Sequence, residues 1–183
     1  MIEKELIEEC RKGDLTNFRR IVDKTSPLIF SVAFRMTGDD NIARDIVQDT
    51  MITIWQKIGK IKSSECFNTW IYRIAVNKCY DHLRKRKREP EYRFDDAAWA
   101  LISNHISDEA APGLENKENA EIINFLTGKL SPKQKEVFIL SELEEMSTNE
   151  IMEITGMYRS SVKANLYYAR KNIRSLFNKY LQR

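Results

Sequence analysis

The stretch FNTWIYRIAVNKCYDHLRKRKR, residues 67–88, constrains the fold of this chain most strongly, because it fits one amphipathic helix. At about 100° per residue, its apolar side chains fall on one broad side of that helix. They are Phe67, Ile71, Ile74, Ala75, Cys79 and Leu83. The whole chain has only six Gly and four Pro, which favours helices over a turn-rich β fold. We therefore expect an all-α protein.

The opposite side of this helix carries side chains that favour nucleic acid. Arg73, Asn77, Tyr80, Arg84 and Lys87 share that side, and Trp70 lies at its border. Cations neutralise phosphates, an amide hydrogen-bonds base edges, and aromatic rings stack on unpaired bases. The pattern predicts contact with single-stranded nucleic acid. A solvated basic helix with a tryptophan in the core is the simpler alternative.

The net charge of +3 conceals a segregation of charge along the chain. Residues 61–90 contain eight basic and three acidic residues, and residues 91–130 contain three basic and eight acidic residues. Residues 157–183 contain seven basic residues and no acidic one. Two basic segments separated by an acidic one predict that the chain contacts a polyanion at two places.

Several classes of protein do not fit this sequence. It has no apolar run of about 18 residues, and its acidic, amphipathic N-terminal segment differs from a secretory signal, so we expect a cytoplasmic protein without membrane insertion. Cys10, Cys66 and Cys79 are odd in number and lack CxxC spacing, which argues against disulfides and zinc. His82 and His105 are isolated. We expect no catalytic residue, metal, cofactor or small-molecule substrate.

Hydrophobic periodicity divides the chain into two small helical domains and a linker. In the first domain, residues 1–88, the expected helices cover residues 3–12, 15–23, 27–37, 41–58 and 67–88. Residues 89–117 contain Pro90, Pro112 and Gly113 among scattered acidic residues and have no sustained period. They are expected to form a flexible acidic linker. The second domain then covers residues 118–183.

Residues 148–166 have the spacing of a helix-turn-helix motif. Ser147 and Glu150 form a capping box for a short helix, and Gly156 supplies the left-handed turn residue. The outward positions of the following basic helix are Ser160, Ser161, Lys163, Ala164, Asn165, Tyr168 and Arg170. These side chains can approach base edges and phosphates. An ordinary pair of antiparallel helices is the alternative.

Capping signals place two further helix starts. Ser131 and Gln134 form a capping box around Pro132 and open a helix expected over residues 132–141. Before the basic helix, Tyr158 stands where a small capping residue is common. Either Ser160 caps a helix that starts later, or the cap is lost at a cost of about 1 kcal/mol.

The helix expected over residues 41–58 has a polar side that is not basic. Its members are Asp45, Gln48, Asp49, Ile52 and Gln56. A phosphate backbone would repel the two carboxylates, whereas an isoleucine beside carboxylates and amides suits docking onto a basic protein surface. A solvated helix face is the alternative.

These motifs, in this order, resemble a small bacterial sigma-70 family factor of the extracytoplasmic-function group. The segment DIVQDTMITIW, residues 45–55, is similar to the region 2 segment that binds the clamp helices of RNA polymerase. The resemblance implies that Asp45, Gln48, Asp49 and Ile52 contact the polymerase. Residues 67–88 resemble the helix that captures and melts the promoter −10 element, with Trp70 and Tyr80 as the first candidates for melting.

The resemblance extends to the flanking segments. The loop that contains Ser63 and Ser64 lies where the family holds a flipped-out base. Residues 130–174 resemble region 4, which recognises the −35 element and contacts the polymerase flap. Met152 stands where the family usually has alanine, and Tyr168 where a basic residue is common. These two departures, together with Tyr158, leave the −35 preference open.

The function that the resemblance implies is promoter recognition without catalysis. The implied partners are core RNA polymerase, through its clamp helices and flap, promoter DNA, and an inhibitory anti-sigma factor. The alternative is a free-standing helix-turn-helix regulator that dimerises through its N-terminal bundle, which would leave the face of Trp70 and Arg84 without a role. An RNA-binding module would explain the basic helix but not the second domain.

Overall fold

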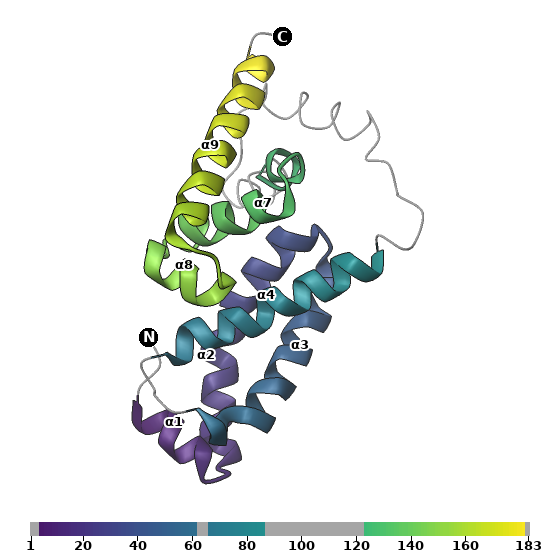
Figure 1. Ribbon diagram of the computed structural model, residues 1–183. Helices are drawn as coiled ribbons and strands as arrows, with labels where there is room; N and C mark the ends of the chain where they lie inside the picture. Colours follow the sequence, from purple (N-terminus) through teal and green to yellow (C-terminus); the bar gives the residue numbers. More distant parts are fainter. Residues whose placement is uncertain (1–3, 62–65, 87–122, 182–183) are drawn as a thin grey trace.

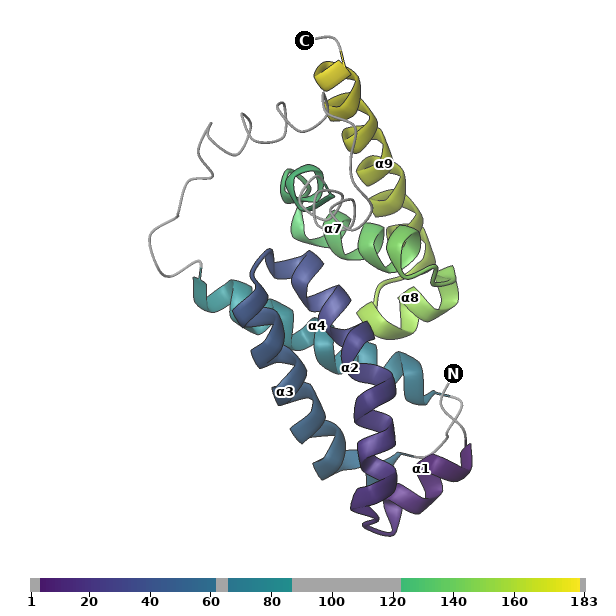
Figure 2. The ribbon, with the colours of Figure 1, turned by 180° about the vertical axis from the view of Figure 1, so that it is seen from behind.

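The computed structural model describes residues 4–61, 66–86 and 123–181 (Figures 1 and 2). All regular secondary structure within these ranges is helical, which confirms the predicted all-α class. The N-terminal helices pack together in one half of the molecule, and the C-terminal helices lie against them on one side (Figure 1). Ser63, Ser64, Lys87 and the predicted linker, residues 89–117, lie outside the described residues.

The described residues of the N-terminal half form four α-helices. They are α1 (Lys4–Arg11), α2 (Leu15–Thr37), α3 (Asp40–Lys57) with a 3-10 turn (Ile58–Lys60), and α4 (Phe67–Arg86). Asp14 and Asp39 cap α2 and α3 by accepting hydrogen bonds from backbone N–H groups of the first turn. Gly38 adopts a left-handed φ of 73°, and its N–H donates to the Phe34 carbonyl.

One predicted boundary in this half is wrong. The sequence predicts separate helices over residues 15–23 and from Pro27, but α2 runs through Pro27 without interruption. Pro27 is exposed, so the carbonyl that loses its partner faces water. Ile21 and Ile29 are fully buried on either side of the proline. Their packing holds the two segments in one helix.

The C-terminal half has the predicted capping boxes and turn. Residues 123–128 are helical and are followed by α7 (Pro132–Phe138), a π-helical turn (Ile139–Leu143), α8 (Thr148–Thr155) and α9 (Arg159–Leu181). Both capping boxes, at Ser131 and Ser147, are formed. Gly156 has a φ of 70°, which confirms the turn of the helix-turn-helix. Because α9 begins at Arg159, Ser160 does not cap it.

Helix α4 is the helix of the N-terminal half that lies alongside α8 of the C-terminal half (Figures 1 and 2). Its predicted apolar side, represented by Phe67, Ile71 and Ala75, packs into the N-terminal core. Tyr72 and Val76 are also buried, although they lie outside that predicted side. They extend the buried surface of α4 toward the C-terminal half, which the periodicity of the isolated helix could not show.

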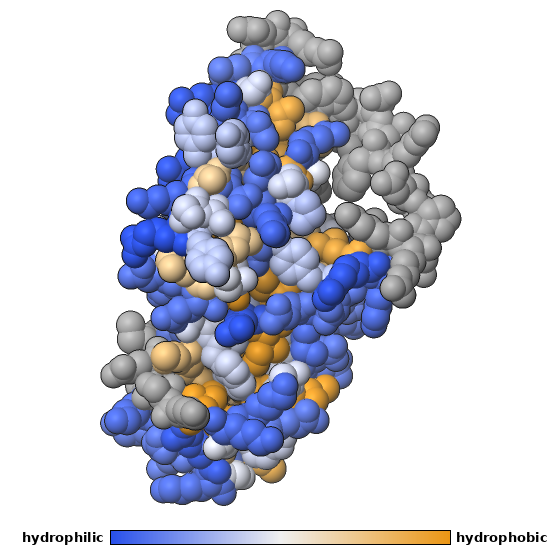
Figure 3. Space-filling model, viewed as in Figure 1, coloured by the Kyte–Doolittle hydropathy of each residue, from blue (hydrophilic) through white to orange (hydrophobic). Residues whose placement is uncertain are grey.

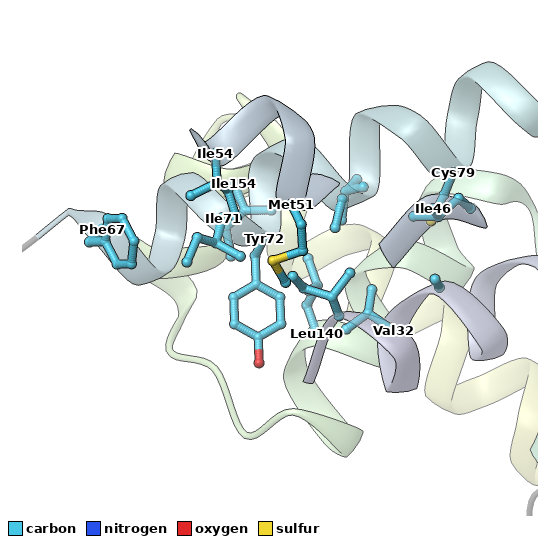
Figure 4. Packing of buried hydrophobic residues seen from close by; sticks show 14 of the residues in the cluster. Val32, Ile46, Met51, Ile54, Phe67, Ile71, Tyr72, Cys79, Leu140 and Ile154 are labelled. Atoms are coloured by element: carbon cyan, nitrogen blue, oxygen red, sulfur yellow. The ribbon is translucent and has the colours of Figure 1, made fainter. Parts of the chain in front are cut away.

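The same hydrophobic cluster continues from one half into the other. Figure 4 shows Leu140 and Ile154, from the C-terminal half, beside Tyr72 and Val32 of the N-terminal half. Leu140 and Val32 are fully buried. The described part of the chain is therefore one packed unit around α4.

The described residues offer neither a membrane span nor a metal centre. No described helix is sufficiently long and apolar to cross a bilayer. Within the described ranges, histidine, cysteine, aspartate and glutamate side chains do not gather in groups of three that could hold a metal ion.

Candidate polymerase and nucleic-acid interfaces

The non-basic face predicted on α3 is exposed as a whole. Asp45, Gln48, Asp49, Ile52 and Gln56 all lie at the surface, and Ile52 is 48% exposed. Ala43, Ile46 and Ile54 on the opposite side are fully buried and fix the orientation of the helix. The surface combines two carboxylates, two amides and an apolar side chain, which suits a protein partner that is basic at its rim.

One of these carboxylates already has a partner on α4. The Lys78 ammonium lies 3.4 Å from Asp49 Oδ2, and the Asp49 side chain remains 55% exposed. An ion pair with this degree of exposure contributes little to stability. Asp49 therefore stays available to an incoming cation.

Three of the predicted −10 contacts form the solvent-facing side of α4. Arg73, Asn77 and Arg84 are exposed and, at spacings of about one and two helical turns, lie on the same side of α4. Trp70 lies at one border, half-buried, with its ring centroid 5.9 Å from that of Phe67. The structure thus brings an indole, an amide and two guanidinium groups to one side of a helix.

Tyr80 lies at the other border of this face and is engaged by the C-terminal half. Its hydroxyl donates a hydrogen bond of 2.6 Å to Glu136 Oε2 of α7. Burial, followed by the nearby carboxylate, raises the pKa of Tyr80 above its ordinary value. In this arrangement the ring of Tyr80 is half-buried, so it is less accessible to a base than the Arg73 face beside it.

Glu136 is a buried acid at this contact, and it predicts a pH dependence. Its side chain is almost fully buried, and burial raises its pKa from 4.5 to about 7 against the lowering effects of Tyr80 and Lys133. The pKa of Glu136 is therefore higher in the folded protein than in the unfolded one. The stabilising contribution of protonated Glu136 is fully present below about pH 4.5 and is lost as the pH rises through about 7. The Lys135 pKa, lowered by burial to about 8, affects stability only above this window.

We therefore expect the free energy of unfolding to fall by about 1–3 kcal/mol more in the wild type than in Glu136→Gln between about pH 5 and pH 7. Glutamine keeps the shape of Glu136 but does not titrate. Urea unfolding at both pH values measures the difference. An identical pH dependence in the two proteins would contradict the raised pKa of Glu136.

The outward side of α9 carries most of the predicted −35 contacts. Ser160, Lys163, Ala164 and Tyr168 are exposed, while Val162 is buried and seats the helix on α8. Figure 3 shows hydrophilic residues over most of the visible side of α9. Small side chains at the start of a helix permit close approach to base edges, and the cations beyond them can contact phosphates.

Three other predicted positions are partly engaged within the domain. Arg170 lies 2.7 Å from Glu142 Oε1, and Asn165 donates to the Ser161 carbonyl. The ion pair lowers the pKa of Glu142. Ser161 and Asn165 are half-buried, so their side chains are less accessible to DNA than the exposed ones of Ser160, Lys163, Ala164 and Tyr168.

Two residues of the candidate −35 surface were not predicted from the sequence. Tyr167 is 62% exposed and lies between Ala164 and Lys171 on the outward side of α9. Arg159 donates a 2.5 Å hydrogen bond to Asn149 Oδ1 of α8, which positions its guanidinium at the start of α9. The helical period counted from buried Val162 places Tyr167 on the outward side of α9, so the sequence alone could have identified this residue. The hydrogen bond between Arg159 and Asn149 has no signal in the sequence.

Comparisons with known proteins agree with this arrangement. Residues 21–89 match sigma-70 region 2, and residues 120–173 match sigma-70 region 4. The ECF RNA polymerase sigma factor SigW of Bacillus subtilis (strain 168) is 30% identical over 181 residues, covering 95% of this chain and 96% of that protein. The ECF RNA polymerase sigma-E factor of Haemophilus influenzae is 26% identical, covering 94% of each chain.

Two solved structures share the fold. CnrH in complex with the cytosolic domain of CnrY superimposes with a TM-score of 0.69 at 22% identity, covering 95% of this chain and 96% of that one. The sigma factor RpoE in complex with the anti-sigma factor NepR from Bartonella quintana gives a TM-score of 0.70 at 21% identity, covering 90% of this chain and 98% of that one.

Proposed function

Because this chain belongs to the extracytoplasmic-function group of the sigma-70 family, whose members direct promoter-specific transcription initiation, we propose that its three exposed faces divide that task. The α3 face binds the polymerase clamp helices, α4 captures the −10 strand, and α9 recognises the −35 element. The proposed domains are residues 1–88 and 118–183, joined by residues 89–117. The observation that carries this assignment is that the acidic face and the two basic faces all lie at the surface on separate helices.

Promoter affinity in this scheme comes from tethering. Binding of the α3 face to the polymerase raises the effective concentration of both DNA-binding helices at the promoter. The polymerase supplies the catalysis, and this chain supplies no catalytic group. We place this activity in the cytoplasm, where polymerase and promoters are found.

The assignment is tested by mixing purified chain with core RNA polymerase and, separately, with duplex promoter DNA. We expect a stable complex with the core enzyme and only weak binding of the isolated chain to duplex DNA. Tight binding to duplex DNA without any binding to core polymerase would instead identify a free-standing regulator.

The proposed role of α9 predicts the effect of a change at Ala164. This residue is exposed on the outward side of the helix, so Ala164→Glu should fold normally. The added carboxylate would meet the phosphates and base edges of the major groove, and we expect −35-dependent transcription to fall by about 100-fold. Run-off transcription with the purified variant measures this loss.

Ser175→Glu is the matched control for Ala164→Glu. Ser175 is exposed on the same helix, about three turns farther along, and receives the same charge. We expect it to retain most transcription. Equal losses in the two variants would show a general charge effect and would contradict placement of Ala164 in the groove.

An inhibitory anti-sigma partner is proposed at the seam between the two halves. A groove of about 440 Å³ opens there, lined by residues that include half-exposed Leu28, Thr69 and Met146. The groove combines a few apolar side chains with many polar and charged ones, which suits an amphipathic helix of another protein. The sigma factor RpoE from Bartonella quintana, which shares this fold, forms a complex with the anti-sigma factor NepR.

A further inference from the structure

The start of α9 carries a contact to which the roles assigned above give no function. Arg159, the first residue of α9, donates a hydrogen bond of 2.5 Å from Nη2 to Oδ1 of Asn149, which lies in the first turn of α8. Both residues are exposed. A single hydrogen bond at the surface contributes little to the free energy of unfolding. The stability of the fold therefore gives little reason for this pair.

Asn149 lies on a turn that is fixed on both sides. The Ser147 hydroxyl accepts a hydrogen bond from the Glu150 N–H at 3.3 Å, and Glu150 Oε2 accepts one from the Ser147 N–H at 2.8 Å. Asn149 lies between these two residues in the chain, so this capping box restrains its backbone. Its amide oxygen is therefore an acceptor at a defined place.

The packing of α8 against α9 fixes the distance between the two partners. Gly156 makes the turn between the helices with a φ of 70°. Ile151 of α8 and Val162 of α9 are each only 1% exposed and belong to the same hydrophobic cluster. The positions of Asn149 and Arg159 thus follow from the core of the domain, and the Arg159 side chain is held in place before any ligand binds.

A guanidinium held in this way is suited to recognise one base. The group carries several N–H donors in one plane, so a bond from Nη2 to Asn149 leaves further donors for a second partner. Two parallel N–H groups match O6 and N7 of guanine in the major groove, and this is the commonest specific contact between a side chain and a base. A side chain that is already ordered loses less conformational entropy on binding.

Tyr158, the residue before Arg159, indicates that a ligand covers this end of α9. It is 83% exposed, more than any other large hydrophobic side chain in the described part of the chain. Its carbonyl accepts the Val162 N–H at 3.0 Å, so Tyr158 occupies the N-cap position, where Ser, Thr, Asp or Asn would stabilise the helix. Neither feature stabilises the free chain. Local rules are broken in this way mainly at functional sites.

We propose that Arg159 selects one guanine of the −35 element, that Asn149 is its positioning residue, and that Tyr158 packs on the nucleotide beside that guanine. This inference rests on the role of α9 proposed above and adds the base that α9 recognises. The alternative is a contact between Arg159 and a phosphate, which would carry no sequence preference.

Transcription by core polymerase with the full chain tests the proposal, on a promoter library with a randomised −35 region and a constant −10 region. We expect the wild type to prefer guanine at one −35 position by at least about tenfold. Arg159→Ala should remove this preference and keep the preferences at the other positions. A uniform loss of transcription from all −35 sequences would identify a phosphate contact and would overturn the proposal.

Arg174→Ala is the matched control for Arg159→Ala. Arg174 is also exposed on α9 and loses the same charge, but it lies about four turns farther along the helix. We expect it to keep the guanine preference. Loss of that preference in both variants would show a general charge effect and would overturn the assignment of the guanine to Arg159.

Two substitutions of Asn149 distinguish positioning from a purely structural bond. Asn149→Ala should reduce the guanine preference by about three- to tenfold, because the guanidinium is no longer held in place. Asn149→Asp keeps the acceptor and should keep the preference, while its charge lowers transcription from all promoters by repelling phosphates. An unchanged guanine preference in Asn149→Ala, with a lower urea midpoint, would reduce the bond to a structural one and contradict the positioning role.

Tyr158→Ser tests the third part of the proposal through two effects of opposite sign. Serine is a good N-cap residue, so we expect the urea midpoint to rise. Transcription that depends on the −35 element should fall several-fold, because the ring no longer packs on DNA. A raised midpoint with unchanged transcription would contradict the contact between Tyr158 and DNA.

The wild-type result separates this inference from the function on which it rests. If the wild type selects no −35 sequence at all, the proposed role of α9 is wrong. If it selects a −35 sequence in which no guanine depends on Arg159, the role of α9 stands and the proposal made here is wrong.

Discussion

Replacing Asp45 and Asp49 together by alanine is expected to reduce core polymerase binding and transcription by at least about 100-fold, because truncating one partner of a desolvated charge pair costs about 2–5 kcal/mol. Both side chains are exposed. Within the described part of the chain, the ion pair between Asp49 and Lys78 connects one of them to another helix. The fold should therefore be unaffected. Fluorescence anisotropy with labelled chain and core polymerase measures the binding loss.

A matched double variant distinguishes the α3 face from net charge. Glu5→Ala with Asp23→Ala removes two exposed carboxylates from α1 and α2 and should bind core polymerase normally. Urea unfolding of both double variants should give the wild-type midpoint. If the Asp45 and Asp49 variant binds core polymerase as the wild type does, the assignment of this face is wrong.

Truncation of Trp70 to alanine is expected to prevent stable promoter opening. Loss of one base–aromatic stack costs about 1–3 kcal/mol, or up to about 150-fold in the stability of the melted complex. The indole is half-buried and lies on the Phe67 ring, so the variant also loses some folding stability. Permanganate reactivity of unpaired thymines in the −10 region measures opening at saturating polymerase.

Trp55→Ala controls for the lost packing. Trp55 is also half-buried and lies on an aromatic ring, with its centroid 4.8 Å from that of Phe18, but it is on α3, away from the Arg73 face. We expect a similar loss of folding stability and normal promoter opening. Equal opening defects in the two tryptophan variants would assign Trp70 to the core instead of the melted strand.

Much of the fold could be predicted because it depends on local signals. The capping residues Ser131 and Ser147 and the left-handed Gly156 act within one or two turns, and the structure has each of them in the predicted role. Pro27 led to a wrong boundary because its local preference for a first turn was overridden by burial of Ile21 and Ile29.

The parts that could not be predicted depend on contacts distant in the sequence. Tyr80 fitted the polar side of an isolated α4, but its bond to Glu136 follows from packing between the two halves. Glu144 carried no signal, because its partners Arg35 and Tyr72 are far away in the chain. Periodicity describes one helix at a time, so it cannot identify a residue that two domains share.

The most direct test of the central claim is transcription by core RNA polymerase with and without this chain on a library of randomised promoter sequences, followed by sequencing of the transcript 5′ ends. We predict that the chain generates new start sites preceded by two fixed sequence blocks, one near −10 and one near −35. A set of start sites identical to that of core polymerase alone would contradict the account.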